Sequence, residues 1–413
     1  MSYKAEFRDH WQPLLAASIG MALGLALNHY VMSLFAPAMI EEFGWSRAQY
    51  ALVGATPFVS MFLIPLGGRL TDRVGPRVAA AIGFTALPLG YLALSFMQGS
   101  FLLFLAIILV KSVLGTLTTT MVFARVIVER YDRARGFALS IVMSSAPLMG
   151  AIAVPFVADI IDDQGWRAAF RALAAISVVG GLICFALMGG KKAAAEEGAR
   201  KTHELTRQEM TRLFKTPLFP LAVGGMLLVN IPQLLVASQM KLVLAENGAV
   251  GDIATWIVSL YAAGVAGGRF LCGLALDRVA VHHVAILVLG LPAIGLAAIA
   301  SSYDATWVLA GSILLMALAQ GAEGDIGAYL ISRKFALRNY SLIASFMTVA
   351  LTLGSAFGSV ILSFVLKKTD SYAAFLLVSA AATLVGAWLF YMTGRYPSQD
   401  DAKPNMQPVG APA

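Results

Sequence analysis

Residues 68–77 read GRLTDRVGPR, a charged stretch that separates two long apolar runs. A related stretch, GLALDRV, occupies residues 273–279 and also follows an apolar run. Arg130 and Arg333 open a second pair of corresponding loops, farther along each half of the chain. Similar loops at matching places indicate that the sequence consists of two related halves.

The apolar runs around these loops continue along nearly the whole chain of 413 residues. Apolar residues make up 59% of the sequence and charged residues 13%, whereas globular proteins carry about 45–50% and about 25%. A helix of about 20 apolar residues spans the ~30 Å hydrocarbon core of a bilayer. Because the runs lack the alternation of barrel strands, the sequence predicts an all-α membrane protein in a lipid bilayer.

We expect twelve transmembrane helices in two pseudo-symmetric six-helix bundles. Two bundles repeated in the same orientation are related by an axis along the membrane normal, and the substrate site is expected between them. The predicted domains are an N-terminal six-helix bundle (1–190), a cytoplasmic linker (191–216), a C-terminal six-helix bundle (217–395) and a disordered cytoplasmic tail (396–413). The predicted spans are residues 12–39, 49–70, 78–97, 101–125, 136–159, 168–189, 218–240, 253–275, 284–302, 305–331, 341–366 and 372–394.

Lysine and arginine residues gather in the loops on one side of this arrangement, which predicts that both termini are cytoplasmic. The same bias accounts for the net charge of +7 without a nucleic-acid partner. Cys184 and Cys272 lie in apolar runs and are expected to be packing residues. The sequence contains no P-loop, metal-ligand cluster or nucleophile motif, so we expect no enzymatic activity, no cofactor and no ATP-driven transport.

The stretch at residues 68–77 matches the pattern G-x-L-x-D-R-x-G-x-R, and the chain thereby resembles the major facilitator superfamily over residues 12–394. The stretch at 273–279 is a weaker second copy, which lacks the trailing glycine and arginine. The resemblance implies the major facilitator fold and a gating role for both loops. The gating residues that it implies are Gly68, Asp72, Arg73, Gly75, Arg77, Gly273, Asp277 and Arg278.

The expected gate depends on charges at helix ends. Asp72 ends the second span, where it suits the positive N-terminal end of a helix in the other half. Span eleven begins at Asn339–Ser341, which are suitable capping residues, and by pseudo-symmetry Asp277 would face the start of span five near Gly136. Such contacts would close the cytoplasmic side. The alternative is that Asp72 and Arg73 are ordinary charges that set the topology.

Further motifs are similar to those of the monocarboxylate transporter family and its bacterial relatives. Two positions differ from the family pattern. Val265 stands where the family has an acidic residue, four positions before the arginine of span eight, and Asn28-His29-Tyr30 stand where the family has a lysine in span one. We expect a monomer in a plasma membrane, specifically a bacterial inner membrane. The matching motifs are Phe43-Gly44-Trp45-Ser46-Arg47, Ser145-Ala146-Pro147 with Pro155, Gly165-Trp166-Arg167, and Gly268-Arg269 with Gly273.

An ionisable side chain within a span costs about 2.5–3.5 kcal/mol on insertion, so such residues are candidates for the substrate path. Arg269 in span eight can hold a carboxylate with two parallel hydrogen bonds, or it can reach the interface or join helices. Lys111 lies mid-way along span four and is the second cationic candidate, unless it is the partner of a buried acid. It heads a polar stripe of Gly115, Thr118, Val122 and Arg125, which is expected to face the central cavity.

Span ten carries two acids in the stretch Gln320-Gly321-Ala322-Glu323-Gly324-Asp325. Burial favours the protonated form of a carboxyl group, and a nearby cation favours the ionised form. Glu323 or Asp325 beside Arg269 or Lys111 can therefore change protonation as substrate enters or leaves. Both are candidates for proton coupling, and the alternative is a permanent ion pair between helices.

Neutral polar residues complete the predicted substrate site. Asn28, His29 and Tyr30 in span one and Asn230 and Gln233 in span seven suit an organic solute. The alternative for the two span-seven amides is that they satisfy backbone groups freed by Pro232, and a lone histidine is equally suited to packing and hydrogen bonding.

The sequence favours a secondary active transporter that moves a small organic carboxylate across the membrane by alternating access, with H+ symport. The alternative is an efflux transporter for drugs or other hydrophobic solutes. Many efflux members carry a glycine-proline-glycine-glycine signature in span five, of which only Pro147 and Gly150 remain here. A receptor or sensor would need an output domain, and the longest internal loop, residues 190–216, leaves no room for one.

Overall fold

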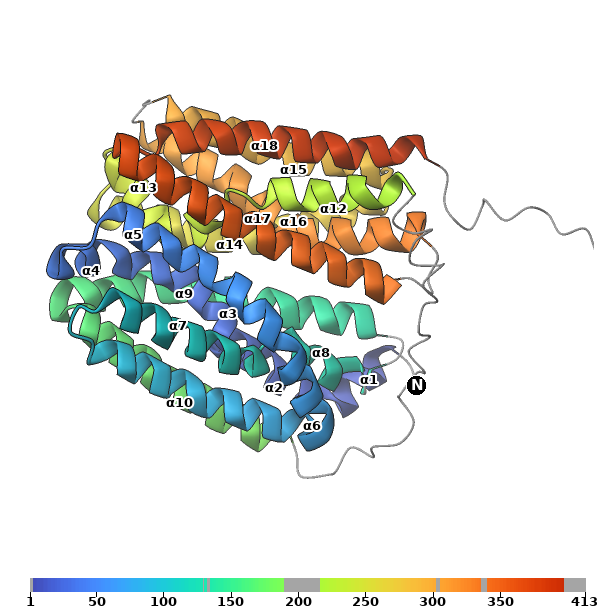
Figure 1. Cartoon of the computed structure of the whole chain (residues 1–413). Helices are drawn as coiled ribbons and strands as arrows, with labels where there is room; N and C mark the ends of the chain where they lie inside the picture. The colour runs from blue at the N-terminus through green and yellow to red at the C-terminus, as the bar shows by residue number, and fades with distance from the viewer. Residues whose placement is uncertain are drawn as a thin grey trace, which may run out of the picture.

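The computed structural model describes residues 3–128, 130–131, 134–188, 216–301, 305–335 and 340–396. Over these residues every regular element is a helix, and ten helices are long and apolar enough to cross a membrane. Figure 1 shows two bundles side by side, one from the blue-to-green half of the chain and one from the yellow-to-red half. The predicted fold class is confirmed, whereas most of the predicted linker and tail lies outside the described residues.

The first bundle contains several interrupted spans. A single helix, α6, covers most of the second and third predicted spans, and it is broken at Gly75, where φ is 82° and ψ is 160°. Glycine reaches this positive φ without steric cost. The elements are α1 (Tyr3–Asp9), α2 (Trp11–Leu23), α3 (Leu25–Val31), η1 (Met32–Phe35), α4 (Ala36–Phe43), α5 (Arg47–Ala51), η2 (Leu52–Ala55), α6 (Thr56–Ser95), α7 (Phe101–Gly115), η3 (Thr116–Thr118), α8 (Thr120–Val128), α9 (Arg135–Gln164) and α10 (Trp166–Leu187).

The second bundle is more regular, except in its first span. There α12 ends at Val229, and Pro232, which has no backbone N–H, lies in the turn that follows. The elements are α12 (Leu218–Val229), the π-helical η4 (Leu235–Gln239), α13 (Met240–Glu246), α14 (Gly251–Leu276), α15 (Val281–Ala300), α16 (Thr306–Lys334), α17 (Tyr340–Thr369), α18 (Ala373–Met392) and η6 (Thr393–Arg395).

The breaks in the first and fourth spans meet each other. Gly24 separates α2 from α3, and the backbone N–H of Leu25 donates to Thr118 Oγ1 at 2.9 Å. A side chain at Gly24 would collide with Thr118, so glycine permits the close approach. Because an unpaired backbone N–H in a membrane interior costs several kcal/mol, Thr118 lets the first span bend next to the centre of the bundle.

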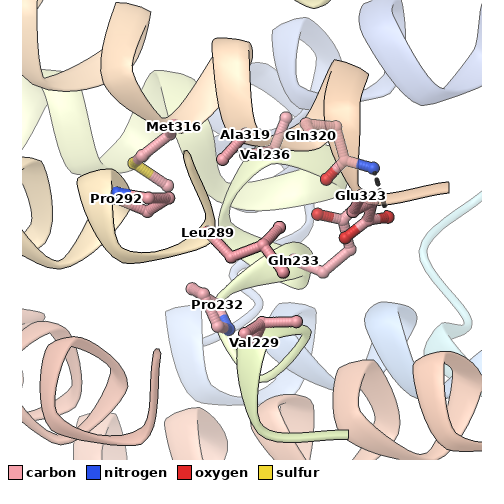
Figure 2. Close-up of a pocket in the computed structure, with 10 residues that line it drawn as sticks. All are labelled: Val229, Pro232, Gln233, Val236, Leu289, Pro292, Met316, Ala319, Gln320 and Glu323. Atoms are coloured by element: carbon pink, nitrogen blue, oxygen red, sulfur yellow. Dashed lines mark hydrogen bonds between the residues drawn. The ribbon is translucent and has the colours of Figure 1, made fainter. Parts of the chain in front are cut away.

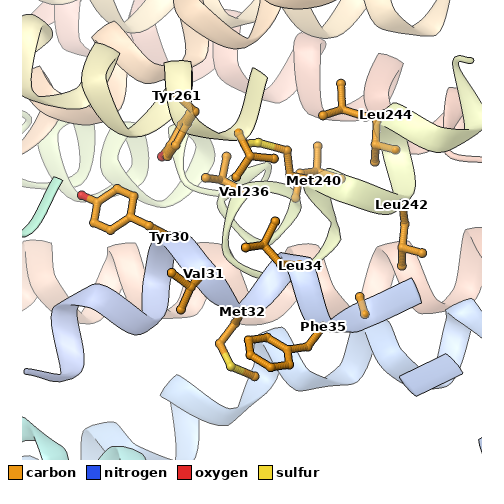
Figure 3. Packing of buried hydrophobic residues seen from close by; sticks show 14 of the residues in the cluster. Tyr30, Val31, Met32, Leu34, Phe35, Val236, Met240, Leu242, Leu244 and Tyr261 are labelled. Atoms are coloured by element: carbon orange, nitrogen blue, oxygen red, sulfur yellow. The ribbon is translucent and has the colours of Figure 1, made fainter. Parts of the chain in front are cut away.

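The core shows where the two halves join. We call the end of the molecule that holds the N-terminus in Figure 1 the termini face and the opposite end the far face. One buried cluster spans both halves, and Figure 3 shows part of it, with Tyr30, Leu34 and Phe35 of the first half near Val236 and Met240 of the second. Toward the termini face each half has its own separate cluster. The halves therefore pack tightly toward the far face and separately at the termini face.

The two aromatic motifs before spans two and six fix the loops of the far face. Trp45 Nε1 donates to the Gly99 carbonyl at 3.0 Å, and Trp166 Nε1 donates to Glu42 Oε2 at 2.6 Å. Arg167 lies 2.6 Å from the other oxygen of Glu42. These contacts stay within the first half, so both motifs have a structural role there.

Candidate functional site

Close packing of α14 and α16 places the predicted arginine beside an acid. A Cβ atom at Gly268 would collide with the backbone of Leu318, and one at Gly321 would collide with that of Val265. With only hydrogen atoms at these positions the helices approach closely, which is a common role of glycine between membrane helices. Arg269 follows Gly268 directly and therefore lies next to the part of α16 that carries the two acids.

Arg269 and Asp325 form an ion pair with Nε 3.8 Å from Oδ2. This distance is too long for a hydrogen bond, and Arg269 Nε is buried without a hydrogen-bond partner among the described residues. The Asp325 side chain is 42% exposed. Arg269 thus connects α14 to α16, which is one of the alternatives considered for it above. Its guanidinium still has hydrogen-bond donors for a further acceptor.

Glu323 lies two residues before Asp325 on α16, on a different face of the helix, and is only 7% exposed. Gln320 Nε2 donates to Glu323 Oε1 at 2.9 Å, as Figure 2 shows. In the described part of the chain no cation lies within ion-pair distance of Glu323, although Arg269 is near enough for an electrostatic interaction. The two predicted acids therefore differ, because Asp325 is ion-paired and Glu323 is held by a neutral amide.

A small cavity adjoins Glu323 on the side of α12 and α15. Its volume of about 30 Å³ is enough for one or two water molecules. Gln233 lines it together with Gln320 and Glu323, as seen in Figure 2. Gln233 is thus placed at the carboxyl group, where a water molecule would have polar partners.

Asn230 is buried next to this group, and its amide is within hydrogen-bonding reach of Glu323. Its Nδ2 donates to the Met226 carbonyl at 2.9 Å, while Oδ1 has no partner among the described residues. The bond to Met226 satisfies a backbone carbonyl near the end of α12. It is not the carbonyl freed by Pro232, which is that of Leu228 and accepts from the Ile231 N–H at 3.3 Å.

Tyrosines from the two halves cover this cluster. Tyr30 packs against Gly150 of α9, and its ring centroid lies 6.3 Å from that of Tyr261. Figure 3 shows the two rings beside each other. Arg269 is near enough to Tyr30 for an electrostatic interaction. Sequence reasoning missed Tyr261, although it lies eight residues before Arg269, on the same face of α14.

Lys111 occupies a different place. It is 1% exposed, and its Nζ donates to Asn28 Oδ1 at 2.8 Å and lies 4.3 Å from the centre of the Tyr91 ring. The predicted polar stripe is interrupted, because α7 ends at Gly115 and the 3-10 turn η3 follows. The structure therefore places Lys111 in a buried contact of α7 with α3 and α6, apart from Arg269.

A cavity of about 310 Å³ lies between the halves, beside α3, α7, η4 and α17. Asn28 and His29 line it, so these predicted residues face a space large enough for a small solute. Among the described residues that line it, His29 alone is titratable. The other polar lining residues are Thr56, Ser60, Ser112, Thr116, Ser238, Thr352 and Ser355.

On the far face a polar network joins the two halves, which we call the far-face bridge (Arg47, Glu246, Asp370, Ser371 and Tyr372). Arg47 Nη1 donates to Glu246 Oε2 at 2.6 Å, and Nη2 lies 2.9 Å from the Asp370 carbonyl and 3.1 Å from its carboxylate. The second oxygen of Glu246 accepts from Ser371 Oγ and from the Tyr372 backbone. Arg47 was singled out only as part of a motif, and no sequence signal identified its partners.

The expected gate on the termini face is not closed by the residues that the structure describes. Asp277 and Arg278 are exposed, and the space around Gly136 is empty within 4 Å. Arg77 donates to the Phe185 carbonyl at 3.3 Å within its own half. Asn339 lies outside the described residues, and the structure does not describe the surroundings of Gly68 or the side chains of Asp72 and Ser341. Arg73 is exposed, and Gly273 has open space around it.

A family model described as Major Facilitator Superfamily matches residues 17–248 and 226–411. Human monocarboxylate transporter 11 is 23% identical over 394 residues, which cover 90% of this chain and 79% of that protein. The probable sulfoacetate transporter SauU of Cupriavidus necator is 32% identical over 163 residues, 36% of this chain and 34% of its own.

Solved structures show the same fold. A mutant of the nucleoside transporter NupG matches with a TM-score of 0.75 at 14% identity, covering 92% of this chain and 99% of the other. A D-xylose-proton symporter matches with a TM-score of 0.72 at 16% identity, covering 92% of this chain and 97% of the other. With two family matches that together span nearly the whole sequence, the chain is a multi-pass membrane transporter that belongs to the Major Facilitator Superfamily and is related to the monocarboxylate transporters.

Proposed function

We propose that the protein is a secondary active transporter for a small organic carboxylate, that it couples transport to H+ symport, and that it acts as a monomer in a bacterial inner membrane with both termini in the cytoplasm. The observation that carries the proposal is the arrangement at α14 and α16. A guanidinium with unused hydrogen-bond donors lies close to a buried carboxyl group that has no ion-pair partner in the described chain.

Arg269 is the anchor for the substrate carboxylate. A guanidinium stays charged and binds a carboxylate through two parallel hydrogen bonds. The long contact to Asp325 offsets part of its charge without using its donors. The relationship to human monocarboxylate transporter 11 and to the probable sulfoacetate transporter supports an organic anion as the solute.

Glu323 is the proton carrier. While the solute carboxylate holds Arg269, the buried Glu323 has only neutral partners, and burial favours its protonated form. When the solute leaves, Arg269 is free to stabilise the ionised Glu323, and the proton departs. Solute and proton are thus bound and released together, which is the requirement for symport.

Alternating access follows from the uneven contact of the halves. Among the described residues the halves are joined at the far face by the far-face bridge and by the shared core cluster, whereas toward the termini face each half packs on a cluster of its own. With cytoplasmic termini, this arrangement is the one expected of an inward-facing state. Opening to the other side requires that the far-face bridge break and that the termini face close.

Transport assays of Arg269→Ala test the proposal. Purified protein in proteoliposomes is given labelled lactate, pyruvate and benzoate, and the variant should lose uptake of whichever acid the wild type carries, while its elution profile stays that of a folded monomer. Normal uptake by Arg269→Ala would remove the anion site from Arg269. Uptake of a hydrophobic drug and of none of the acids would support the efflux alternative instead.

A further inference from the structure

Lys111 is a buried cation without an acidic partner in the described part of the chain. Its Nζ is held by a neutral amide oxygen, Asn28 Oδ1, at 2.8 Å and by the face of the Tyr91 ring at 4.3 Å. Its stem packs on Gly90, where a Cβ atom would collide with it. The fold therefore encloses the amino group completely and gives it only neutral partners among the described residues.

The orientation of Asn28 is fixed by this contact. Its Oδ1 accepts from Lys111 Nζ and also lies 3.4 Å from the hydroxyl group of Tyr91. The side-chain hydrogen bonds of Asn28 all use Oδ1, and its Nδ2 group has no acceptor among the described residues. Asn28 lines the 310 Å³ cavity next to His29, whereas Lys111 does not.

We propose that Lys111 is a positioning residue that acts through Asn28. It holds Oδ1 inside the first half, so that the Nδ2 N–H groups of Asn28 donate to an oxygen of an anionic solute in the cavity. The inference rests on the proposed transport of organic anions and extends it. It adds a contact from the first half of the chain, the Asn28–Lys111 pair, to the proposed anchor at Arg269 in the second half.

The remainder of the cavity defines the class of solute. Among the lining residues that face this space, hydroxyl groups such as those of Ser112 and Thr116 alternate with apolar groups such as Leu25 and Ile108. Among the described residues that line the cavity there is no lysine, arginine, aspartate or glutamate. A solute that fits this space is small, and its uncharged part bears both apolar and hydrogen-bonding groups.

The test is a kinetic comparison in proteoliposomes, with labelled lactate and pyruvate as probes. Asn28→Asp keeps an acceptor for Lys111 but removes both N–H donors, and Lys111→Met removes the group that orients the amide. Each variant should raise KM about ten-fold or more, as expected for a lost hydrogen bond to a charged group, with Vmax within about two-fold of the wild type. The matched control is Ser95→Ala. Ser95 is a buried polar residue of α6 that donates to the Leu92 carbonyl and does not line the cavity, so its loss should leave KM nearly unchanged.

An unchanged KM in Asn28→Asp overturns the inference, and this variant decides the matter if Lys111→Met fails to fold. A Lys111→Met protein that is present in smaller amount but has the wild-type KM also overturns it, because that result describes a purely structural lysine. If the wild type carries neither acid nor any other carboxylate, the proposed function fails as well. If Arg269→Ala abolishes uptake and Lys111→Met leaves it unchanged, the proposed function stands and only the inference about Lys111 fails.

Discussion

Substitution of Arg47 by alanine should shift the protein toward the state that is open at the far face. Arg47 Nη1 lies 2.6 Å from Glu246 and its Nη2 2.9 Å from the Asp370 carbonyl, and both partners belong to the other half. The side chains are partly accessible, 29% for Arg47, 24% for Glu246 and 81% for Asp370. The bridge must break when the far face opens, so its loss destabilises only the closed state.

The magnitude follows from this exposure. A hydrogen bond to a charged group contributes about 1.5–3 kcal/mol, whereas an exposed ion pair contributes about 0.2–1 kcal/mol. We discount the exposed contact to Asp370 and expect Arg47→Ala to cost the closed state about 1–2 kcal/mol, which raises the ratio of open to closed molecules about 5–30-fold.

Pulsed electron–electron distance measurements can detect this shift. The free, buried cysteines Cys184 and Cys272 are first replaced. Spin labels are then attached at Asp163 and Lys368, which are exposed near the far-face ends of the two halves, and the distance between the labels reports the opening of that face. The matched control is Arg167→Ala. Arg167 forms an ion pair of the same length, 2.6 Å, and similar exposure with Glu42, but within one half. No shift in Arg47→Ala, or an equal shift in Arg167→Ala, would refute the reasoning.

Three further predictions concern the site and the packing that supports it. Glu323→Gln keeps a neutral hydrogen-bonding side chain, so solute exchange should continue while accumulation driven by a proton gradient is lost; full accumulation would place the coupling group elsewhere. Gly268→Leu should lower the melting temperature of the purified protein, because the new side chain meets the Leu318 backbone and overpacking costs about 1–3 kcal/mol or more. The control Gly267→Leu places its side chain in open space and should leave the melting temperature nearly unchanged. Thr118→Val leaves the Leu25 N–H without its acceptor. We expect faster hydrogen exchange at that amide and a free energy of unfolding lower by about 1–3 kcal/mol. Unaltered exchange would show that another acceptor replaces Thr118.

The fold was open to prediction because its signals are local. Apolar runs of membrane-spanning length and the repeated charged loops at residues 68–77 and 273–279 determine the number and order of the spans. Interruptions were harder to anticipate, since the end of α7 at Gly115 depends on the packing of Thr118 against α3. That interruption is the reason why the predicted stripe from Lys111 does not face the cavity as one surface.

The site was accessible only in part, for a related reason. An ionisable residue within an apolar span is recognisable from the sequence alone, and Arg269 and Glu323 were found in this way. The partners of such residues depend on which helices touch, and nothing in the sequence links Arg47 with Glu246, 199 residues away. In the same way, the contact of Lys111 with Asn28 joins residues 83 positions apart.

The central claim is that the buried cations serve an organic anion that travels with a proton. Its most direct test is uptake of labelled lactate and pyruvate by the wild-type protein in proteoliposomes, with an inward proton gradient and after the gradient is abolished. The account predicts accumulation above the outside concentration only with the gradient, at least for one acid. Equal uptake under both conditions would contradict proton symport, and no uptake of any carboxylate, whatever the gradient, would contradict the anion site itself.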